Sequence, residues 1–219
     1  MIDDRPRRPP TAQEFVLGEL RRGIVTGALQ PGEQIRQDAL ADRLGTSRVP
    51  LREALKILEG EGLVTYHPHR GYFVAALSAE DLAEVYRIRE LLESEAIRCA
   101  VPLLTDADVV ALEAALLDVE AATDAHDIVR ITATNRAFHF LLLEHSQMPR
   151  LVRLIRQLWD STDAYRSVYF ADEHNREQVR QEHRAILDAV RTRDPERTLA
   201  MLHLHRENAV QRVTDVLEG

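Results

Sequence analysis

The chain has 219 residues, of which 45% are hydrophobic and 29% are charged, and its formal net charge is −8 at pH 7. This length and composition are sufficient for one large or two small domains with cores of their own. No stretch approaches the roughly 20 consecutive apolar residues that a membrane-spanning helix needs, and the one cysteine, Cys99, excludes an internal disulfide framework and indicates the reducing cytoplasm.

The charge is distributed unevenly along the chain. Residues 1–75 contain 11 Arg and Lys against 10 Asp and Glu, and the remaining residues contain 17 against 26. Only the first part, with a net charge of +1, can approach the phosphates of a nucleic acid without strong repulsion. We therefore expect the two parts to have different partners.

Short elements separated by turn residues are predicted over residues 12–75, after a polar, proline-rich segment at 1–11 that we expect to be disordered. Apolar side chains at helical spacing predict three helices, at 12–26, 38–44 and 47–61. Gly45 separates the second helix from the third, for which Ser47 is the expected N-cap. A helix, a brief turn with glycine and a second helix are typical of a helix-turn-helix.

Two β-type runs follow at 63–66 and 71–74, with the turn residue Pro68 between them, and they predict a hairpin that forms a wing. After a linker at 76–78 the periodicity becomes helical. Helices are predicted at 79–100, 105–125, 128–146, 150–170, 173–192 and 196–217. The expected fold is therefore mainly α: a winged helix-turn-helix of three helices and a β-hairpin, then an antiparallel all-helical bundle of about six helices over 79–219.

The third helix has the features of a DNA-reading helix. Arg48 and Arg52 are four residues apart and share one face, whereas leucines at helical spacing form another face. The arginines lie in the first half of the helix, where a recognition helix meets base edges, and arginine pairs bidentately with guanine. Ser47 and the helix N-terminus are placed to bind a phosphate, and Lys56, the only lysine, to bind the DNA backbone. The alternative is an ordinary solvated surface.

Several histidines of the second part lie on the apolar faces of their helices. His205 falls on the stripe of the last helix, whereas His203 is about 200° away around that helix. His183 falls on the inner face of the preceding helix, and Asn135 and His139 fall on or beside that of the helix at 128–146. Three nitrogen ligands with one oxygen ligand suit a divalent metal site that keeps open positions. The alternative is a set of satisfied core histidines.

The first part resembles the GntR family of bacterial repressors from Leu20 to Leu63, through L-A-x-x-L-G-x-S-R-x-P-L-R-E-A-L and the motif before it. The resemblance implies that Arg48 and Arg52 read bases, and it implies several further contacts with DNA. These involve Ser47, Pro50 and the wing residues His69, Arg70 and Gly71. Some relatives have an arginine near the start of the second helix, where this sequence has Asp38, so nearby Arg36 is the expected substitute.

The second part resembles the FCD effector domain of the FadR subfamily, through N-R-A-F-H at 135–139 and E-H-R-A-I-L-D-A-V at 182–190. The resemblance implies four metal ligands: Asn135, His139, His183 and His205. Asn replaces the more usual Asp, which removes a negative charge and weakens metal binding. Zn²⁺ is the first expectation, with Ni²⁺ or Mn²⁺ as alternatives.

The resemblance also implies an effector, a small organic acid that binds the metal. Arg89 is the expected partner of its carboxylate, unless it forms a surface salt bridge with Glu93, and Asn208 is a further polar candidate. We therefore expect a cytoplasmic, homodimeric repressor whose affinity for a DNA operator is controlled by this acid. One alternative is a hydrolytic metalloenzyme, for which Glu182 would be a base although it should face away. The other is a metal-free module that senses an acyl-CoA or only dimerises.

Overall fold

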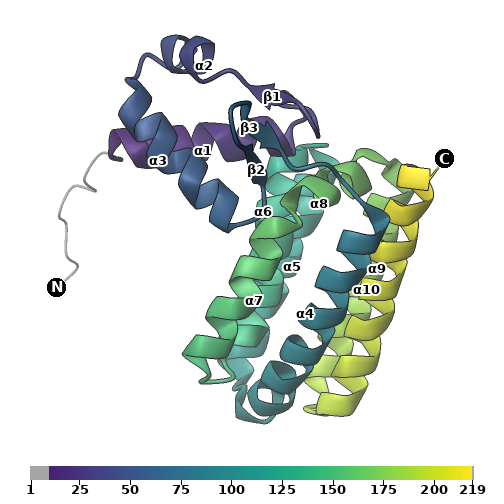
Figure 1. The fold of residues 1–219 in the computed structure, drawn as a ribbon. Helices are drawn as coiled ribbons and strands as arrows, with labels where there is room; N and C mark the ends of the chain where they lie inside the picture. Colours follow the sequence, from purple (N-terminus) through teal and green to yellow (C-terminus); the bar gives the residue numbers. More distant parts are fainter. Residues whose placement is uncertain (1–9, 219) are drawn as a thin grey trace, which may run out of the picture. The chain divides into compact units, whose positions relative to one another are not determined.

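The computed structural model describes residues 10–218, and the chain divides into two compact units, one ending at Ala75 and one beginning at Ala76. The elements of each unit are drawn in Figure 1. Of the segment 1–11 that we expected to be disordered, residues 1–9 lie outside the described residues, and Thr11 is the N-cap of the first helix. No helix among the described residues has the length and apolar character to cross a membrane.

The first unit is a winged helix-turn-helix, as predicted. Its elements are α1 (Ala12–Val25), β1 (Gln34–Ile35), α2 (Gln37–Arg43), α3 (Arg48–Gly60), β2 (Val64–His67) and β3 (Gly71–Val74). The strand β1 was not predicted. It pairs antiparallel with β3 and extends the hairpin to a sheet of order β1-β3-β2. Two residues, of which only Ile35 is buried, are too few to give an alternating pattern.

Helix α3 has two distinct faces. Leu51, Leu55 and Leu58 are fully buried, and α3 packs mainly against α1. Because residues three and four apart share a helix face, burial of these leucines leaves Arg48 and Arg52 exposed on another side. The hydrophobic face of α3 thus sets the direction of its arginines.

The second unit is an all-helical bundle, as predicted. It consists of α4 (Ala79–Ala100), the short 3₁₀ helix η1 (Val101–Leu103), α5 (Asp106–Asp124), α6 (Ile128–Glu144), α7 (Pro149–Ser161), α8 (Asp163–Ala171), α9 (Glu173–Arg191) and α10 (Pro195–Glu218). Five of these helices begin with a side chain that accepts a hydrogen bond from a backbone N–H of the first turn: Ser78, Thr105, Asp127, Asp172 and Asp194. The bundle encloses buried clusters that include Phe138, Trp159 and Ile186.

The prediction of one helix over 150–170 was wrong, because the chain bends at Thr162 between α7 and α8. The Arg166 guanidinium donates to the carbonyl oxygen of Trp159 and, at 2.8 Å, to Oγ1 of Thr162, and so links the start of α8 to the end of α7. Trp159 and Tyr165 are buried on either side of the bend. The apolar pattern therefore continues through the bend and does not reveal it.

Candidate metal centre and nucleic-acid interface

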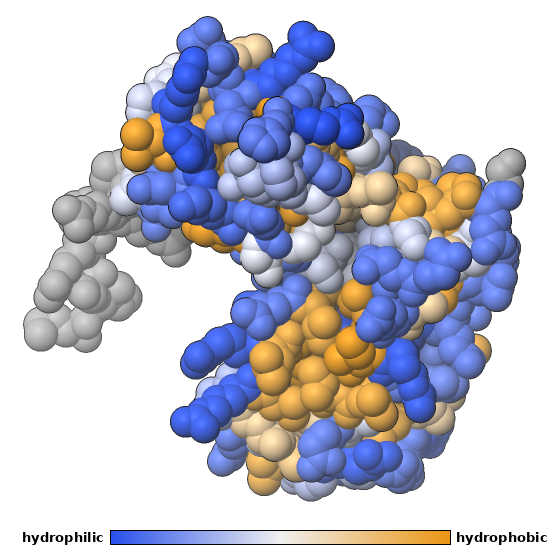
Figure 2. All heavy atoms as spheres, viewed as in Figure 1, coloured by the Kyte–Doolittle hydropathy of each residue, from blue (hydrophilic) through white to orange (hydrophobic). Residues whose placement is uncertain are grey.

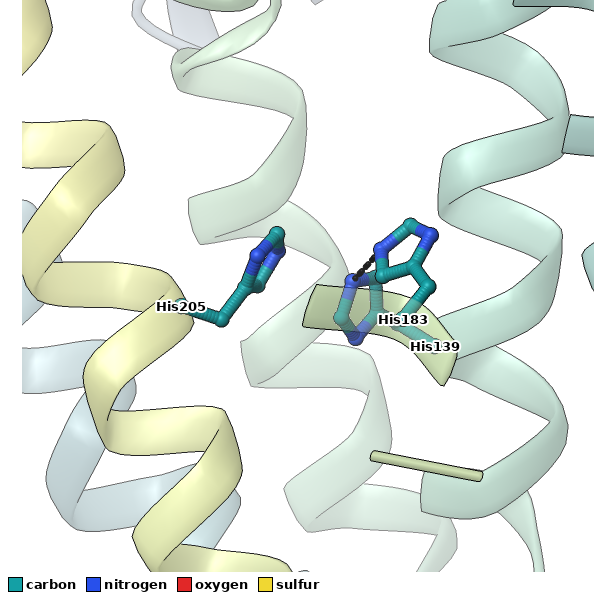
Figure 3. Close-up of side chains that lie close together, drawn as sticks. All are labelled: His139, His183 and His205. Atoms are coloured by element: carbon teal, nitrogen blue, oxygen red, sulfur yellow. Dashed lines mark hydrogen bonds between the residues drawn. The ribbon is translucent and has the colours of Figure 1, made fainter. Parts of the chain in front are cut away.

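Three histidines from three helices converge inside the bundle (Figure 3). His139 comes from α6, His183 from α9 and His205 from α10, and each is buried. One ring nitrogen of each lies within 4.8 Å of those of the other two. The two Nε2 atoms of His139 and His183 are 3.2 Å apart. The structure thus brings together the three histidines that helical periodicity placed on inner faces, and it leaves the side chain of His203 49% exposed.

The surroundings favour the neutral form of His139 and His183. Burial lowers the pKa of His139 well below the ordinary 6.5, and the neighbouring histidines and then Arg89 and Arg206 lower it further. Burial and the neighbouring His205 likewise lower the pKa of His183 well below 6.5. Neutral imidazole is the form that binds a metal ion. Two nitrogen ligands about 2.1 Å from one metal lie about 3.0–3.4 Å apart, and the separation between His139 and His183 falls in this interval.

Asn135 lies one turn before His139 on α6 and is buried. Its Oδ1 atom has no hydrogen-bond partner among the described residues, and Nδ1 of His183 has none either. Such an unpaired buried oxygen costs about 1–3 kcal/mol, so it is a group that a bound ion would satisfy. Three imidazoles and one amide oxygen therefore fit a divalent metal. Nδ1 of His183, which has no partner in the described part of the chain, differs from the usual arrangement, in which the second ring nitrogen of a ligating histidine donates a hydrogen bond.

A cavity of about 30 Å³ adjoins the cluster and is lined by Asn135, His139 and His205. Its other lining includes the aromatic residues Tyr86, Trp159, Tyr165, Tyr169 and Phe170 and the charged residues Arg89, Glu93, Arg166 and Arg206. Three cationic side chains and one anionic side chain favour an anionic ligand. The volume suffices for a few atoms only, so a larger ligand requires side chains to move.

Arg89 does pair with Glu93, but not at the surface. Both side chains are buried, and Nε of Arg89 donates to Oε1 of Glu93 at 2.9 Å. The guanidinium lies 4.1 Å from the ring centre of Trp159, and its Nη1 has no hydrogen-bond partner among the described residues. Burial raises the pKa of Glu93, but Arg89 and Arg206 outweigh this effect and hold it below its ordinary value. Arg89 thus has a partner and a free donor.

Glu182 was expected to face away from the histidines, and this was wrong. Its Oε2 lies 2.6 Å from Nδ1 of His205, and its Oε1 accepts a hydrogen bond of 2.6 Å from Nδ2 of Asn208. The periodicity of α9 predicts only the direction in which Cβ of Glu182 points. The carboxylate lies two bonds beyond Cβ, and it reaches His205 and Asn208 on α10. Asn208 lines a separate surface groove with Tyr86 and His203.

The predicted DNA-contacting residues of the first unit gather around one groove. The lining of this groove includes Arg36, Arg48, Arg52, Lys56, His69, Arg70 and Gly71. Ser47 is the N-cap residue of α3, is exposed and makes no capping hydrogen bond with its side chain, and Pro50 is half-buried in the first turn. The groove therefore joins the exposed face of α3 to the wing.

Asp38, which departs from the pattern of some relatives, contacts a proposed base-reading residue. Its Oδ1 lies 2.5 Å from Nε of Arg48, and both side chains are about two-thirds exposed, at 67% and 69%. A surface ion pair of this kind contributes about 0–1 kcal/mol. Arg48 can therefore leave Asp38 for DNA at little cost.

The tip of the wing is held by its neighbours. Gly71 has φ +87°, a conformation that strains other residues, and Nε2 of Gln34 donates to the carbonyl oxygen of Arg70 at 2.6 Å. The guanidinium of Arg70 lies 5.1 Å from the ring centre of Phe73. These contacts position an exposed cation beside α3.

The sequence matches two family models, "Bacterial regulatory proteins, gntR family" at residues 12–74 and "FCD domain" at residues 84–208. It is 30% identical over 204 residues to the HTH-type transcriptional regulator YdhC of Bacillus subtilis, covering 91% of this chain and 90% of that protein. It is 28% identical to the Nta operon transcriptional regulator of Aminobacter aminovorans, covering 87% and 89%. The solved structure of Escherichia coli McbR/YncC matches with a TM-score of 0.82 and 26% identity, covering 95% of this chain and 99% of that one. The chain therefore belongs to the GntR family of bacterial transcription regulators and has an FCD domain as its second part.

Proposed function

We propose that this regulator is a repressor whose affinity for its operator is controlled by a small carboxylate bound at a metal centre in the FCD domain. The observation that carries the proposal is the convergence of three buried imidazoles from α6, α9 and α10. The relatives are transcription regulators, and we infer that the metal centre senses a ligand and does not catalyse a reaction.

The proposed ligands of the metal are His139, His183, His205 and Oδ1 of Asn135. We propose Zn²⁺ as the metal, with Ni²⁺ or Mn²⁺ as alternatives, because imidazole suits Zn²⁺ and Ni²⁺ and an amide oxygen suits Mn²⁺. Replacement of a carboxylate ligand by the neutral amide of Asn135 leaves more positive charge at the centre. A bound ion would supply a Lewis-acidic centre with open positions for the oxygen atoms of a carboxylate.

The proposed carboxylate binds in the adjoining cavity. The free Nη1 of Arg89 is a donor for it, and the excess of cationic lining residues supports an anionic ligand. The small volume favours a short organic acid over an acyl-CoA. We propose Arg89 as the main protein contact of the effector, whereas the amide of Asn208 is occupied by Glu182.

The proposed nucleic-acid contacts lie along α3 and the wing. Arg48 and Arg52 read base edges, and Lys56, Arg36 and Arg70 neutralise phosphates. The exposed Ser47 hydroxyl, Pro50, His69 and Gly71 lie against the DNA surface. These roles suit a helix entering the major groove with its N-terminal half.

We propose that the regulator is a homodimer that reads two half-sites of a near-palindromic operator. Exposed apolar side chains support a second copy on the bundle: Ile88 and Leu91 on α4 and Leu154 on α7. Figure 2 shows an apolar area over these two helices, bordered by hydrophilic residues. Apolar areas of this kind are typical of protein interfaces.

Recovery of genomic DNA fragments bound by the purified protein tests the proposed regulation of an operator. Wild type should enrich a short near-palindrome, and the Arg48→Ala/Arg52→Ala variant should not. Acids related to the products of the neighbouring genes are then added to the operator complex, with wild type and His139→Ala in parallel. A change in DNA affinity only with the wild-type protein supports the metal-dependent sensor. An equal change in both proteins contradicts it, and turnover of an acid by the wild type alone would indicate an enzyme.

A further inference from the structure

Glu182 contacts the histidine cluster from outside the set of proposed ligands. Its Oε2 atom lies 2.6 Å from Nδ1 of His205, and the two side chains are only 10% and 11% exposed. The distance is short for a hydrogen bond between nitrogen and oxygen, as is common when one partner is charged.

The contact determines which nitrogen of His205 holds the proton. An ionised carboxylate only accepts hydrogen bonds, so Nδ1 of a neutral His205 must be the N–H donor. Nε2 then has the lone pair and is the atom available to a metal ion. The same bond restricts rotation of the ring.

The carboxylate of Glu182 is itself held in place by two amides. Nδ2 of Asn208 donates to its Oε1 at 2.6 Å, and Nε2 of Gln178 donates to the same oxygen at 2.9 Å. Glu182 is not part of the group of side chains whose ligand atoms lie within 4.8 Å of one another, which among the described residues contains only the three histidines. Its position is therefore that of a support for a ligand and not of a fourth ligand.

We propose that Glu182 is a positioning residue of the metal centre, which holds His205 with its Nε2 directed at the ion, and that Asn208 and Gln178 fix Glu182. This inference rests on the metal site of the proposed function. It assigns Asn208 to the support of the metal centre and not to the effector. Partners of this kind that orient a ligating histidine typically change metal affinity 10–100-fold when they are removed.

The test is the affinity of the metal-stripped, full-length protein for Zn²⁺, measured by competition with a chelating dye. Glu182→Ala should bind Zn²⁺ about 10–100-fold more weakly than wild type. The Zn²⁺ affinity of Glu182→Gln should lie between those of wild type and Glu182→Ala. Its side-chain carbonyl oxygen still accepts a hydrogen bond from Nδ1 of His205, but it has no charge. The matched control is Glu177→Ala, on the same helix, whose half-exposed carboxylate pairs with Arg180.

Thermal unfolding of the metal-free variants separates positioning from a structural role. If Glu182→Ala lowers the melting temperature but binds Zn²⁺ within about twofold of Glu177→Ala, the inference is overturned. The failure of the underlying site has a different signature. If wild type and His183→Ala have the same weak affinity for Zn²⁺, the metal site is absent and both proposals fall.

Discussion

Nε2 of His139 lies 3.2 Å from Nε2 of His183, although the two residues belong to different helices and are 44 positions apart. In the metal-free protein one of these nitrogens can donate a hydrogen bond to the other, and the accepting ring must then be a neutral imidazole. The same separation is that of two nitrogen ligands on one ion. The core of the FCD domain is thus arranged so that binding of a metal requires little movement of these rings.

Acidification should destabilise the metal-free protein through these histidines. Their pKa values in the folded state are well below the ordinary 6.5, and the unfolded chain regains the ordinary value. As the pH falls below about 6.5, the unfolded state binds protons that the folded state does not, and the free energy of unfolding decreases by up to about 1.4 kcal/mol per pH unit for each histidine. Urea unfolding between pH 7.5 and about 5.5 measures this slope. An equally steep slope in a His183→Leu variant would contradict the assignment, whereas His203→Ala should retain it.

Removal of Arg89 should destabilise the protein much more than removal of Arg87, two residues away. Arg89→Ala takes one partner from the buried carboxylate of Glu93, which keeps Arg206 and Trp159. The loss should therefore be smaller than the about 3–5 kcal/mol that an unpaired buried charge costs. Arg87 pairs with Glu90 and its side chain is 68% exposed, so Arg87→Ala should cost about 0–1 kcal/mol. Urea unfolding of both variants gives the comparison. Similar small losses would mean that the pair of Arg89 and Glu93 is not isolated from water.

Substitutions along α3 should separate base reading from phosphate binding. Arg48→Ala and Arg52→Ala should each cost about 1–3 kcal/mol of binding free energy for the operator and relax the preference at one base pair, because each removes a proposed contact with a base. Lys56→Ala should weaken binding to all sequences alike. It should also reduce the slope of log K against log salt concentration by about 1, because one fewer counterion is released. Fluorescence anisotropy with operator and scrambled duplexes at several salt concentrations measures both effects. A uniform loss in the arginine variants would assign them to phosphates.

Asp38→Ala should strengthen DNA binding. The carboxylate lines the proposed DNA groove and holds Nε of Arg48, so its loss removes repulsion from phosphates and frees the arginine. Because the pair is exposed, the gain should be modest, on the order of 1 kcal/mol. Asp42→Ala, an exposed carboxylate of the same helix, is the control. A loss of operator affinity in Asp38→Ala would instead mean that Asp38 orients Arg48 in the complex.

Sequence periodicity was sufficient where one face of a helix decides the outcome. It separated His205 from His203, which are two positions apart on α10, and it placed Arg48 and Arg52 on the exposed side of α3. Whether each of these side chains is buried or exposed follows from the position of its Cα atom relative to the apolar stripe of the helix. The helical bundle and the winged helix-turn-helix follow from the same patterns.

Contacts between helices were beyond the reach of periodicity. The bond from Glu182 to His205 depends on the separation of α9 and α10 and on a long side chain, neither of which the sequence of α9 contains. Burial of Arg89 follows from the packing of α4 against α7, where Trp159 covers it. Hydrogen bonds of the Arg166 side chain span the bend at Thr162, and they leave no trace in the apolar pattern.

The most direct test of the account is the metal content of protein purified without chelators, measured by atomic emission for wild type, His139→Ala and His203→Ala. We predict about one equivalent of metal per chain in wild type and in His203→Ala, and little in His139→Ala. The wild type should also lose thermal stability when the metal is stripped, because an ion that binds only the folded state stabilises it. Wild-type protein that neither contains nor takes up a divalent metal, or equal metal in His139→Ala, would contradict the proposed centre.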